Sequence, residues 1–336
     1  MSIALSLKYR PKDFNEVSSQ NSIIKILQKQ VETGSFVNCY LFSGPSGTGK
    51  TTLARILANK INKGLGSPIE IDAASNNGID NVRLIIDQAV QRSIDSEYKV
   101  YIIDECHMLT NQAWNALLKL IEEPPEYTIF MFCTTEIQKV PETIKNRCQQ
   151  YKLTRIPNNY IYDRLSLICK REGITYNKEG LESITKMAMG SMRQAISYLD
   201  KCKDFSTTIN VDNVLSVLGN FSYDVFFDLV NALIDKNNSV IINTVEELYN
   251  RGDDLRLFVD LFSEFILDLD KYIIFKSFEI IKIPSSYLEK IEYTINVENP
   301  EKYYGHLIDK LLELKQLIKG DNNLRVTLEI FLISRI

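Results

Sequence analysis

The chain has few of the residues that build metal sites and disulfides. Its 336 residues include six cysteines and two histidines. The cysteines stand singly, mostly inside apolar runs, and none forms a C-x-x-C pair. This spacing gives no zinc or redox-dithiol motif and favours buried free thiols. The histidines, His107 and His306, are too few and too far apart in the sequence to suggest a metal site.

Long apolar runs and a strong charge imbalance are also missing. No window approaches eighteen uninterrupted apolar residues, and the N-terminus, MSIALSLKYRPKDF, lacks the apolar core of a signal peptide. We therefore expect a soluble, cytoplasmic protein with no membrane partner. A net charge of −4 argues against a free-standing nucleic-acid-binding domain, because such domains are usually basic. Any contact with nucleic acid would be local or shared with other subunits.

A glycine-rich stretch from Asn38 to Thr52 is the strongest signal that is present. A short apolar run leads into a G-x-x-x-x-G-K-[ST] pattern, and an Ala/Leu-rich helical pattern follows it. The glycines allow backbone N–H groups to converge on a polyphosphate, and the helix N-terminus adds positive charge. Lys50 is then expected to reach the β- and γ-phosphates, and the Thr51 hydroxyl to ligate Mg²⁺. The full expected ATP-binding set of this loop is Gly44, Pro45, Ser46, Gly47, Thr48, Gly49, Lys50, Thr51 and the neighbouring Thr52.

A second motif, which is acidic, follows the glycine-rich loop at about the distance of one sheet crossover. The apolar run 99–103 reads as a buried parallel strand, and it ends in Asp104 and Glu105. Alone, this pattern fits a solvated strand end equally well. At this distance after the glycine-rich loop it predicts Asp104 as a partner of Mg²⁺ and Glu105 as the general base that polarises the attacking water.

The remaining pattern predicts an α/β domain followed by helices. Further strands are expected near 69–73, 128–133 and 150–153, with helices between them, which gives a five-stranded, mostly parallel sheet. Beyond Pro157 no strand signal is visible: three helices, a polar link over 204–210 and longer helices from Val211 onward are predicted. We expect a P-loop ATPase domain (1–156), a small all-α lid domain (157–208) and an all-α collar domain for oligomerisation (209–336).

Several motifs occur in an order that points to a family. They are KYRP at 8–11, Val17 and Gln20, the glycine-rich loop, VYIIDECHML at 100–109, NALLKLIEEPP at 115–125, CTTE at 133–136, NRC at 146–148 and GSMRQAIS at 190–197. The sequence closely resembles the gamma/tau subunits of the bacterial DNA polymerase III clamp loader, within the AAA+ ATPases. It is similar, more distantly, to the small subunits of replication factor C. The resemblance is dense to about residue 200 and weak beyond 210.

The resemblance implies roles for residues outside the glycine-rich loop. Thr135 falls on the sensor-1 position, and Arg193 on sensor 2, which would reach the γ-phosphate of the same subunit. Arg147 falls on the arginine finger, which would act in trans on the ATP of a neighbouring subunit. Two further residues, Arg10 and Pro11, lie where the family's N-terminal segment borders the adenine.

Primer-template DNA is the other ligand that the resemblance implies. Related loaders contact the phosphates of the DNA backbone with helix N-termini and a few basic or polar residues. The matching segment here holds Asn77, Gly78 and Arg83. Such contacts position the protein without reading sequence, and if several subunits share them, no single chain needs to be strongly basic.

The sequence departs from the family pattern in three places. Residues 62–68 stand where bacterial members usually carry a four-cysteine zinc module, so we expect no zinc. The chain stops after the third predicted domain, so we expect it to lack the tau extension that binds polymerase and helicase. Gln194 replaces the acidic residue that is usual after sensor 2.

The predicted function is therefore that of an ATP-driven motor subunit of a sliding-clamp loader, in a hetero-oligomeric, pentameric ring, acting in DNA replication with a sliding clamp, other loader subunits and primer-template DNA. Two alternatives stay open at this point. One is another AAA+ ATPase that remodels DNA, such as a Holliday-junction or recombination-linked enzyme. The other is a structural subunit that binds nucleotide without hydrolysing it.

Overall fold

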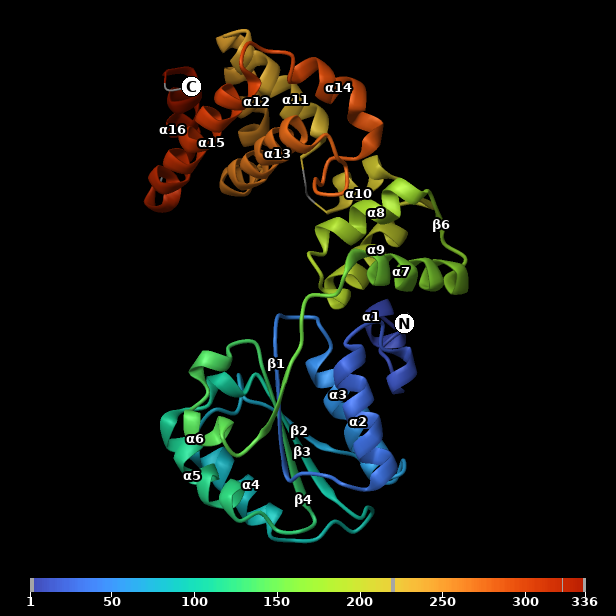
Figure 1. The fold of residues 1–336 in the computed structure, drawn as a ribbon. Helices are drawn as coiled ribbons and strands as arrows, with labels where there is room; N and C mark the ends of the chain where they lie inside the picture. The colour runs from blue at the N-terminus through green and yellow to red at the C-terminus, as the bar shows by residue number, and fades with distance from the viewer. Residues whose placement is uncertain (1–2, 219–220, 322, 335–336) are drawn as a thin grey trace. The chain divides into compact units, whose positions relative to one another are not determined.

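The computed structural model describes residues 3–218, 221–321 and 323–334. These residues form two compact units (Figure 1). The first contains the residues up to Glu172 together with Ala188–Asp200, and the second contains Gly173–Met187 together with the residues from Lys201 onward. The division into three domains at 156 and 208 stays a prediction, and its outer limits at residues 1 and 336 lie outside the described residues.

A five-stranded parallel sheet forms the centre of the first unit. Its strands follow the spatial order β2-β3-β4-β1-β5, and every neighbouring pair is parallel. Parallel strands covered on both faces need apolar side chains throughout, and every residue of β1 and β4 is buried. The predicted five-stranded layer is confirmed. The strands are β1 Cys39–Ser43, β2 Ile69–Asp72, β3 Lys99–Asp104, β4 Thr128–Thr134 and β5 Gln149–Lys152.

Helices cover both faces of this sheet (Figure 1). Because side chains alternate along a strand, Tyr40 and Phe42 of β1 pack against one helical layer while Cys39 and Leu41 pack against the other. The first layer is α2 Asn21–Thr33 and α3 Lys50–Ile61, and the second is α4 Ile79–Ala89, α5 Asn111–Glu122 and α6 Glu142–Lys145.

The short N-terminal helix is bound to α7 (Asn158–Glu172) and to the part of α9 (Met192–Phe205) that belongs to the same unit, up to Asp200. Helix α1 itself spans Leu5–Lys8. The backbone N–H of Leu5 donates to the Asp200 carboxylate at 3.0 Å, and Arg164 donates to the Tyr9 carbonyl at 2.8 Å. The Tyr9 hydroxyl also donates to Glu172 at 2.5 Å. The N-terminal segment therefore lies against α7 and α9 before the chain enters the sheet.

Among the described residues of the second unit, the regular structure is helical apart from one short strand pair. Thr175–Tyr176 (β6) pairs in parallel with Thr208–Ile209 (β7). The prediction that no strand lies beyond Pro157 is therefore wrong, because a two-residue strand is too short to produce a periodic signal. The helices are α8 Lys178–Met187, α10 Val211–Val217, α11 Tyr223–Ile234, α12 Asn238–Asn250, α13 Leu255–Phe275, α14 Leu288–Thr294, α15 Pro300–Leu317 and α16 Leu324–Ser334.

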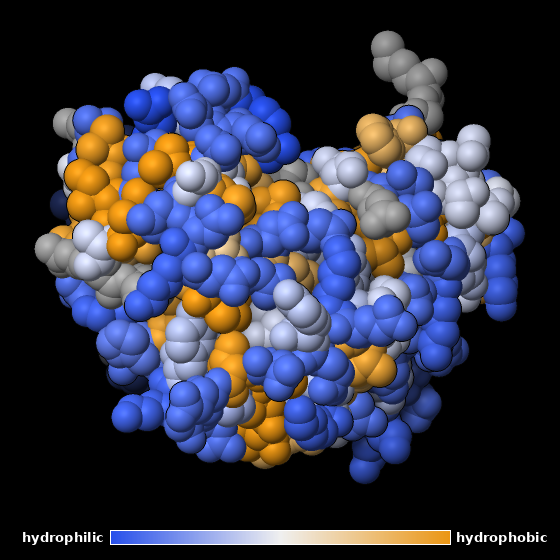
Figure 2. Space-filling model, turned by 90° about the horizontal axis from the view of Figure 1, so that it is seen from above, coloured by the Kyte–Doolittle hydropathy of each residue, from blue (hydrophilic) through white to orange (hydrophobic). Residues whose placement is uncertain are grey.

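An aromatic cluster holds the later helices together. Phe226 of α11 packs against Phe258, Phe262 and Phe265 of α13, with ring centroids between 5.3 and 5.8 Å apart. Such rings bury large apolar areas, so α11 and α13 form the centre of this core. On the outside, Figure 2 shows apolar side chains in small groups among hydrophilic ones. Every helix that the structure describes is too short or too polar to cross a membrane.

We expect Leu41→Ala to destabilise the first unit by about 2–5 kcal/mol, because the fully buried side chain leaves a cavity in the sheet core. Leu65→Ala is the control, since Leu65 is 62% exposed, and should change the free energy of unfolding by no more than ~0.5 kcal/mol. Urea unfolding can be followed through Trp114, the only tryptophan, which lies in the same core as Leu41. Equal effects of the two substitutions would contradict the assigned core.

Candidate nucleotide-binding site

The loop between β1 and α3 can be built only with glycine at its turns. Gly44 and Gly47 have φ angles of +144° and +73°, which other residues rarely adopt. A Cβ at Gly44 would lie 2.4 Å from the Leu153 carbonyl oxygen, and one at Gly47 would lie 2.0 Å from the Ser191 hydroxyl oxygen. The loop therefore packs closely against the segment after β5 and against the start of α9.

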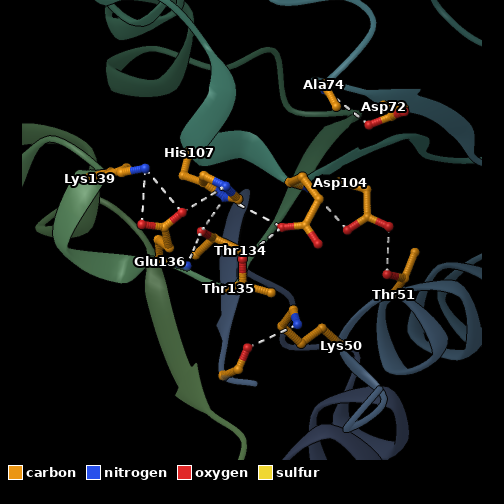
Figure 3. A network of polar contacts seen from close by, with 12 residues as sticks. Lys50, Thr51, Asp72, Ala74, Asp104, His107, Thr134, Thr135, Glu136 and Lys139 are labelled. Carbon is orange, nitrogen blue, oxygen red and sulfur yellow. Dashed lines mark hydrogen bonds and ion pairs between the residues drawn. The ribbon is translucent and has the colours of Figure 1, made fainter. Parts of the chain in front are cut away.

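Lys50, the first residue of α3, points back across this loop (Figure 3). Its side chain is almost fully buried, and Nζ donates to the carbonyl oxygens of Gly44 at 2.9 Å and Pro45 at 3.0 Å. Burial lowers the pKa of Lys50, while the carboxylates of Glu105 and Asp104 raise it. A cation in this position, held only by carbonyl oxygens, is suited to binding phosphate.

Thr51 and Asp104 are in contact although they come from different parts of the sheet. Thr51 lies in the helix after β1, Asp104 ends β3, and β4 lies between these two strands. The Thr51 hydroxyl donates to Asp104 Oδ2 at 2.8 Å (Figure 3). Asp104 Oδ1 accepts from the Glu105 backbone N–H at 3.0 Å. Asp104 is the last residue of β3, so its carboxylate stands at the carboxyl edge of the sheet. A hydroxyl and a carboxylate are hard oxygen donors of the kind that Mg²⁺ prefers.

Glu105 lies beside this pair in an uncommon backbone conformation. Its φ and ψ of 46° and 42° place it in the left-handed region, which residues other than glycine adopt only uncommonly. Glu105 Oε2 accepts a hydrogen bond from the Thr135 hydroxyl at 3.1 Å. The structure thus brings together two residues that the sequence assigned separately, as general base and as sensor 1.

One close neighbour of Glu105 was missed by the sequence reasoning, which considered histidine only as a metal ligand. His107 Nδ1 lies 3.4 Å from Glu105 Oε2 and 3.1 Å from the Thr134 hydroxyl, and Nε2 lies 3.3 Å from Glu136 Oε1. The position of His107, three residues after Asp104 at a strand end, was the available signal.

A cavity of about 370 Å³ opens between the loop, the N-terminal segment and the start of α9. Its polar wall contains Lys50, Thr51, Asp104 and Glu105, together with backbone from the loop. Its apolar wall includes Leu7, Val17 and Ile196. A lining that combines charged and apolar side chains suits a molecule that joins a polyanion to a flat ring.

Two of the predicted arginines border this cavity. Arg10 and Arg193 both line it, as does Pro11, and the Arg10 Nε donates to the Thr52 hydroxyl at 3.3 Å. Burial is the main cause that lowers the pKa of Arg10, and neighbouring Arg55 and Arg193 lower it further. Arg193 also lowers the pKa of Lys50, after the larger effect of burial. Positive charge is therefore concentrated at one place in a chain of net charge −4.

Four other predicted residues lie away from the cavity. Arg147, which follows α6, donates to the Thr143 carbonyl at 2.7 Å and forms an ion pair with Glu122 at 2.5 Å. Its side chain is 37% exposed. The candidate DNA-contact residues Asn77, Gly78 and Arg83 lie at and near the N-terminus of α4, and Arg83 forms an ion pair with Asp80 at 3.1 Å.

Comparison with known proteins matches two segments to described families. Residues 68–157 match the family "DNA polymerase III, delta subunit", and residues 160–202 match "DNA polymerase III clamp loader subunit, ATPase lid domain". The DNA polymerase III subunit gamma of Buchnera aphidicola is 31% identical over 92% of this chain and 90% of that protein. The chain belongs to the gamma/tau family of DNA polymerase III subunits.

Longer members of the gamma/tau family are similar as well. The DNA polymerase III subunit tau of Bacillus subtilis is 36% identical over 98% of the chain, and the gamma/tau subunit of Mycoplasma genitalium is 34% identical over 91%. The chain spans only 62% and 54% of the lengths of these two relatives.

Solved structures of the Thermotoga maritima RuvB branch migration motor share the fold. One superposes with a TM-score of 0.53 and 21% identity, covering 67% of this gamma/tau-family chain and 79% of the motor. A variant of the same motor with one substitution gives a TM-score of 0.54 and 18% identity, covering 89% and 98% of the two chains. This likeness confirms the AAA+ P-loop fold, and at such identity it shows the fold alone.

The contact between the loop and the start of α9 can be tested through stability. We expect Gly47→Ala to destabilise the first unit by about 1–3 kcal/mol more than Gly34→Ala, because its Cβ meets Ser191. Gly34 is a matched control: its φ of +65° is similar, so both substitutions carry backbone strain of about 1–2 kcal/mol, but no atom lies within 4 Å of its added Cβ.

Adding Ser191→Gly should recover part of the loss in the Gly47→Ala variant but not in the Gly34→Ala variant. Urea unfolding followed by Trp114 fluorescence measures both comparisons. If the two glycine substitutions were equally destabilising, or if Ser191→Gly acted additively with Gly47→Ala, the close packing would be contradicted.

Proposed function

We propose that the chain is an ATP-hydrolysing motor subunit of a sliding-clamp loader that acts in DNA replication. Support comes most directly from one edge of the sheet, where Lys50, the Thr51–Asp104 pair and the Glu105–Thr135 pair converge beside a nucleotide-sized cavity. Family membership supplies the biological setting, since the named relatives are subunits of DNA polymerase III.

ATP would lie with its triphosphate on the loop. The backbone N–H groups of residues 44–49 and the α3 N-terminus would surround the phosphates, and Lys50 would bind the β- and γ-phosphates. Mg²⁺ would take the place of the hydrogen bond between Thr51 and Asp104, with phosphate oxygens and water completing its coordination. The adenine would lie toward the apolar wall, bordered by Arg10 and Pro11.

Hydrolysis would depend on residues on both sides of the γ-phosphate. Glu105 would polarise the attacking water, Thr135 would orient Glu105 or the phosphate, and Arg193 would reach the phosphate from α9 of the same chain. Arg147 would act on the ATP of a neighbouring subunit. Its half-exposed ion pair with Glu122 is of a type worth about 0–1 kcal/mol, so little opposes its release toward a phosphate.

The remaining predictions complete this proposal. The P-loop domain (1–156) and the lid (157–208) would hold ATP, and the helices of 209–336 would form the collar of a hetero-oligomeric ring of about five subunits in the cytoplasm. ATP binding would enable the loader ring to open a sliding clamp. Primer-template DNA would then align Arg147 of one subunit with the ATP of the next, and hydrolysis would release the closed clamp.

We expect Arg147→Ala to lower the ATP turnover stimulated by clamp and primed DNA by about 10³- to 10⁵-fold without weakening nucleotide binding, because the guanidinium stabilises charge only in the transition state. Lys50→Ala should abolish both. Steady-state turnover in the reconstituted complex and the binding of a fluorescent ATP analogue measure the two effects.

Arg251→Ala is the matched control, since Arg251 is also an exposed arginine in an ion pair, with Asp253 at 2.8 Å. It should retain both activities. Unaltered stimulated turnover in the Arg147 or Lys50 variant would refute the proposal. Ring opening of a labelled clamp separates clamp loading from other DNA remodelling, and a single-turnover assay separates a motor from a subunit that binds ATP without cleaving it.

For the DNA contacts we expect a change in salt dependence. If Arg83 neutralises one phosphate, Arg83→Ala should weaken binding of primed DNA regardless of its sequence and reduce the slope of log K against log salt by about 1. Arg92, whose exposed guanidinium lies 5.1 Å from the Tyr127 ring centroid, provides the control. Fluorescence anisotropy with labelled primer-template DNA over a salt series makes the measurement, and equal slopes for both variants would contradict the assignment.

A further inference from the structure

His107 lies between the proposed general base and the protein surface. It belongs to the short 3-10 helix Cys106–Met108 that follows β3, and its side chain is only 7% exposed. The proposed function leaves it without a role. Its ring has a carboxylate on each side, Glu105 at Nδ1 and Glu136 at Nε2. Figure 3 shows the side facing Glu136.

The contacts of His107 connect Glu105 to an exposed ion pair. Nε2 lies 3.3 Å from Glu136 Oε1, and Lys139 Nζ lies 3.0 Å from Glu136 Oε2. Glu136 is 37% exposed and Lys139 is 55% exposed. A line of polar contacts therefore runs from the buried side of Glu105 through one imidazole ring to a charged pair in contact with solvent.

The hydrogen positions on this ring determine how firmly Glu105 is held. A neutral imidazole carries one N–H and one acceptor nitrogen. With the hydrogen on Nδ1, the ring can donate to Glu105. With the hydrogen on Nε2, it donates to Glu136, and Nδ1 accepts from the Thr134 hydroxyl at 3.1 Å. In that second arrangement, of the two contacts described for Glu105 Oε2, only the hydrogen bond from Thr135 is left.

We propose that His107 is a positioning residue for Glu105, and that the Glu136–Lys139 pair sets how strongly it acts. This inference rests on the proposed function, in which Glu105 orients water. Two contacts on the same oxygen, Oε2, fix the direction of the carboxylate better than one, and a misplacement of about 1 Å can lower turnover on the order of 100-fold. A change in the Glu136–Lys139 ion pair would alter the contacts of the His107 ring and, through them, the direction of the Glu105 carboxylate.

The test uses two substitutions that each keep one of the ring's contacts. The Asn amide nitrogen can replace Nδ1 and so hold Glu105, while the Gln amide nitrogen reaches the place of Nε2 and so holds Glu136. We expect His107→Gln to lower kcat for ATP on the order of 10- to 100-fold with KM unchanged. His107→Asn should retain turnover within a few-fold of the wild type, on the order of 3-fold at most.

The surface pair is tested separately. Glu136→Gln should change kcat at least about 3-fold in the wild-type background, and should have no effect in the His107→Asn background, because the Asn side chain is too short to reach position 136. Glu313→Gln is the control: Glu313 is 42% exposed and forms an i,i+3 pair with Lys310 at 3.2 Å in the second unit, and its substitution should leave kcat unchanged.

All variants are measured in the full complex with clamp and primed DNA, beside binding of a fluorescent ATP analogue. Equal loss in the Asn and Gln variants would indicate that His107 acts only by packing and would overturn the inference, as would wild-type turnover in both. An unchanged kcat for Glu136→Gln would contradict the role of the Glu136–Lys139 pair but would not bear on the role of His107. If the wild-type complex binds ATP but does not hydrolyse it, the proposed function fails and this inference fails with it.

Discussion

The site depends on three adjacent parallel strands that end at the same edge of the sheet. In the order β3-β4-β1, the carboxyl ends deliver Asp104 and Glu105, Thr134 and Thr135, and the glycine-rich loop. Strand spacings of about 4.8 Å place the first and third strand ends roughly 10 Å apart. The glycine-rich loop and the first turn of α3 cover that distance, so that the Thr51 hydroxyl lies 2.8 Å from Asp104. An antiparallel β4 would bring its other end, at Thr128, to this edge, and Glu105 would then have neither Thr135 nor Thr134 nearby.

The loop is also held from the side opposite the sheet. The Met192 backbone N–H donates to the Gly47 carbonyl at 3.1 Å, and Gly190 accepts from the Ile156 N–H at 3.0 Å. These bonds place Arg193 beside Lys50 although the two residues are far apart in the sequence. The result is a small region of converging positive charge within an acidic chain, which is where a polyanion would be attracted.

The sequence was sufficient to predict the local structure around residues that are close together in the chain. The loop at 44–51 and the Asp104-Glu105 pair are local patterns, and the buried strands around them are long enough to show their apolar character. It was insufficient where contacts depend on how distant segments pack. The ion pair of Arg147 with Glu122 and the bond from Tyr9 to Glu172 leave no pattern in the sequence. For His107 the sequence shows its place near a strand end but not its contact with Glu136.

Every proposed role depends on a triphosphate and Mg²⁺ occupying the edge formed by these strands. The most direct measurement is a structure of the chain determined with a non-hydrolysable ATP analogue and Mg²⁺. We expect the β- and γ-phosphates to lie against Lys50 and the backbone of residues 44–49, with the metal ion between Thr51 and Asp104. A nucleotide bound elsewhere, or this loop empty at saturating analogue, would contradict this expectation.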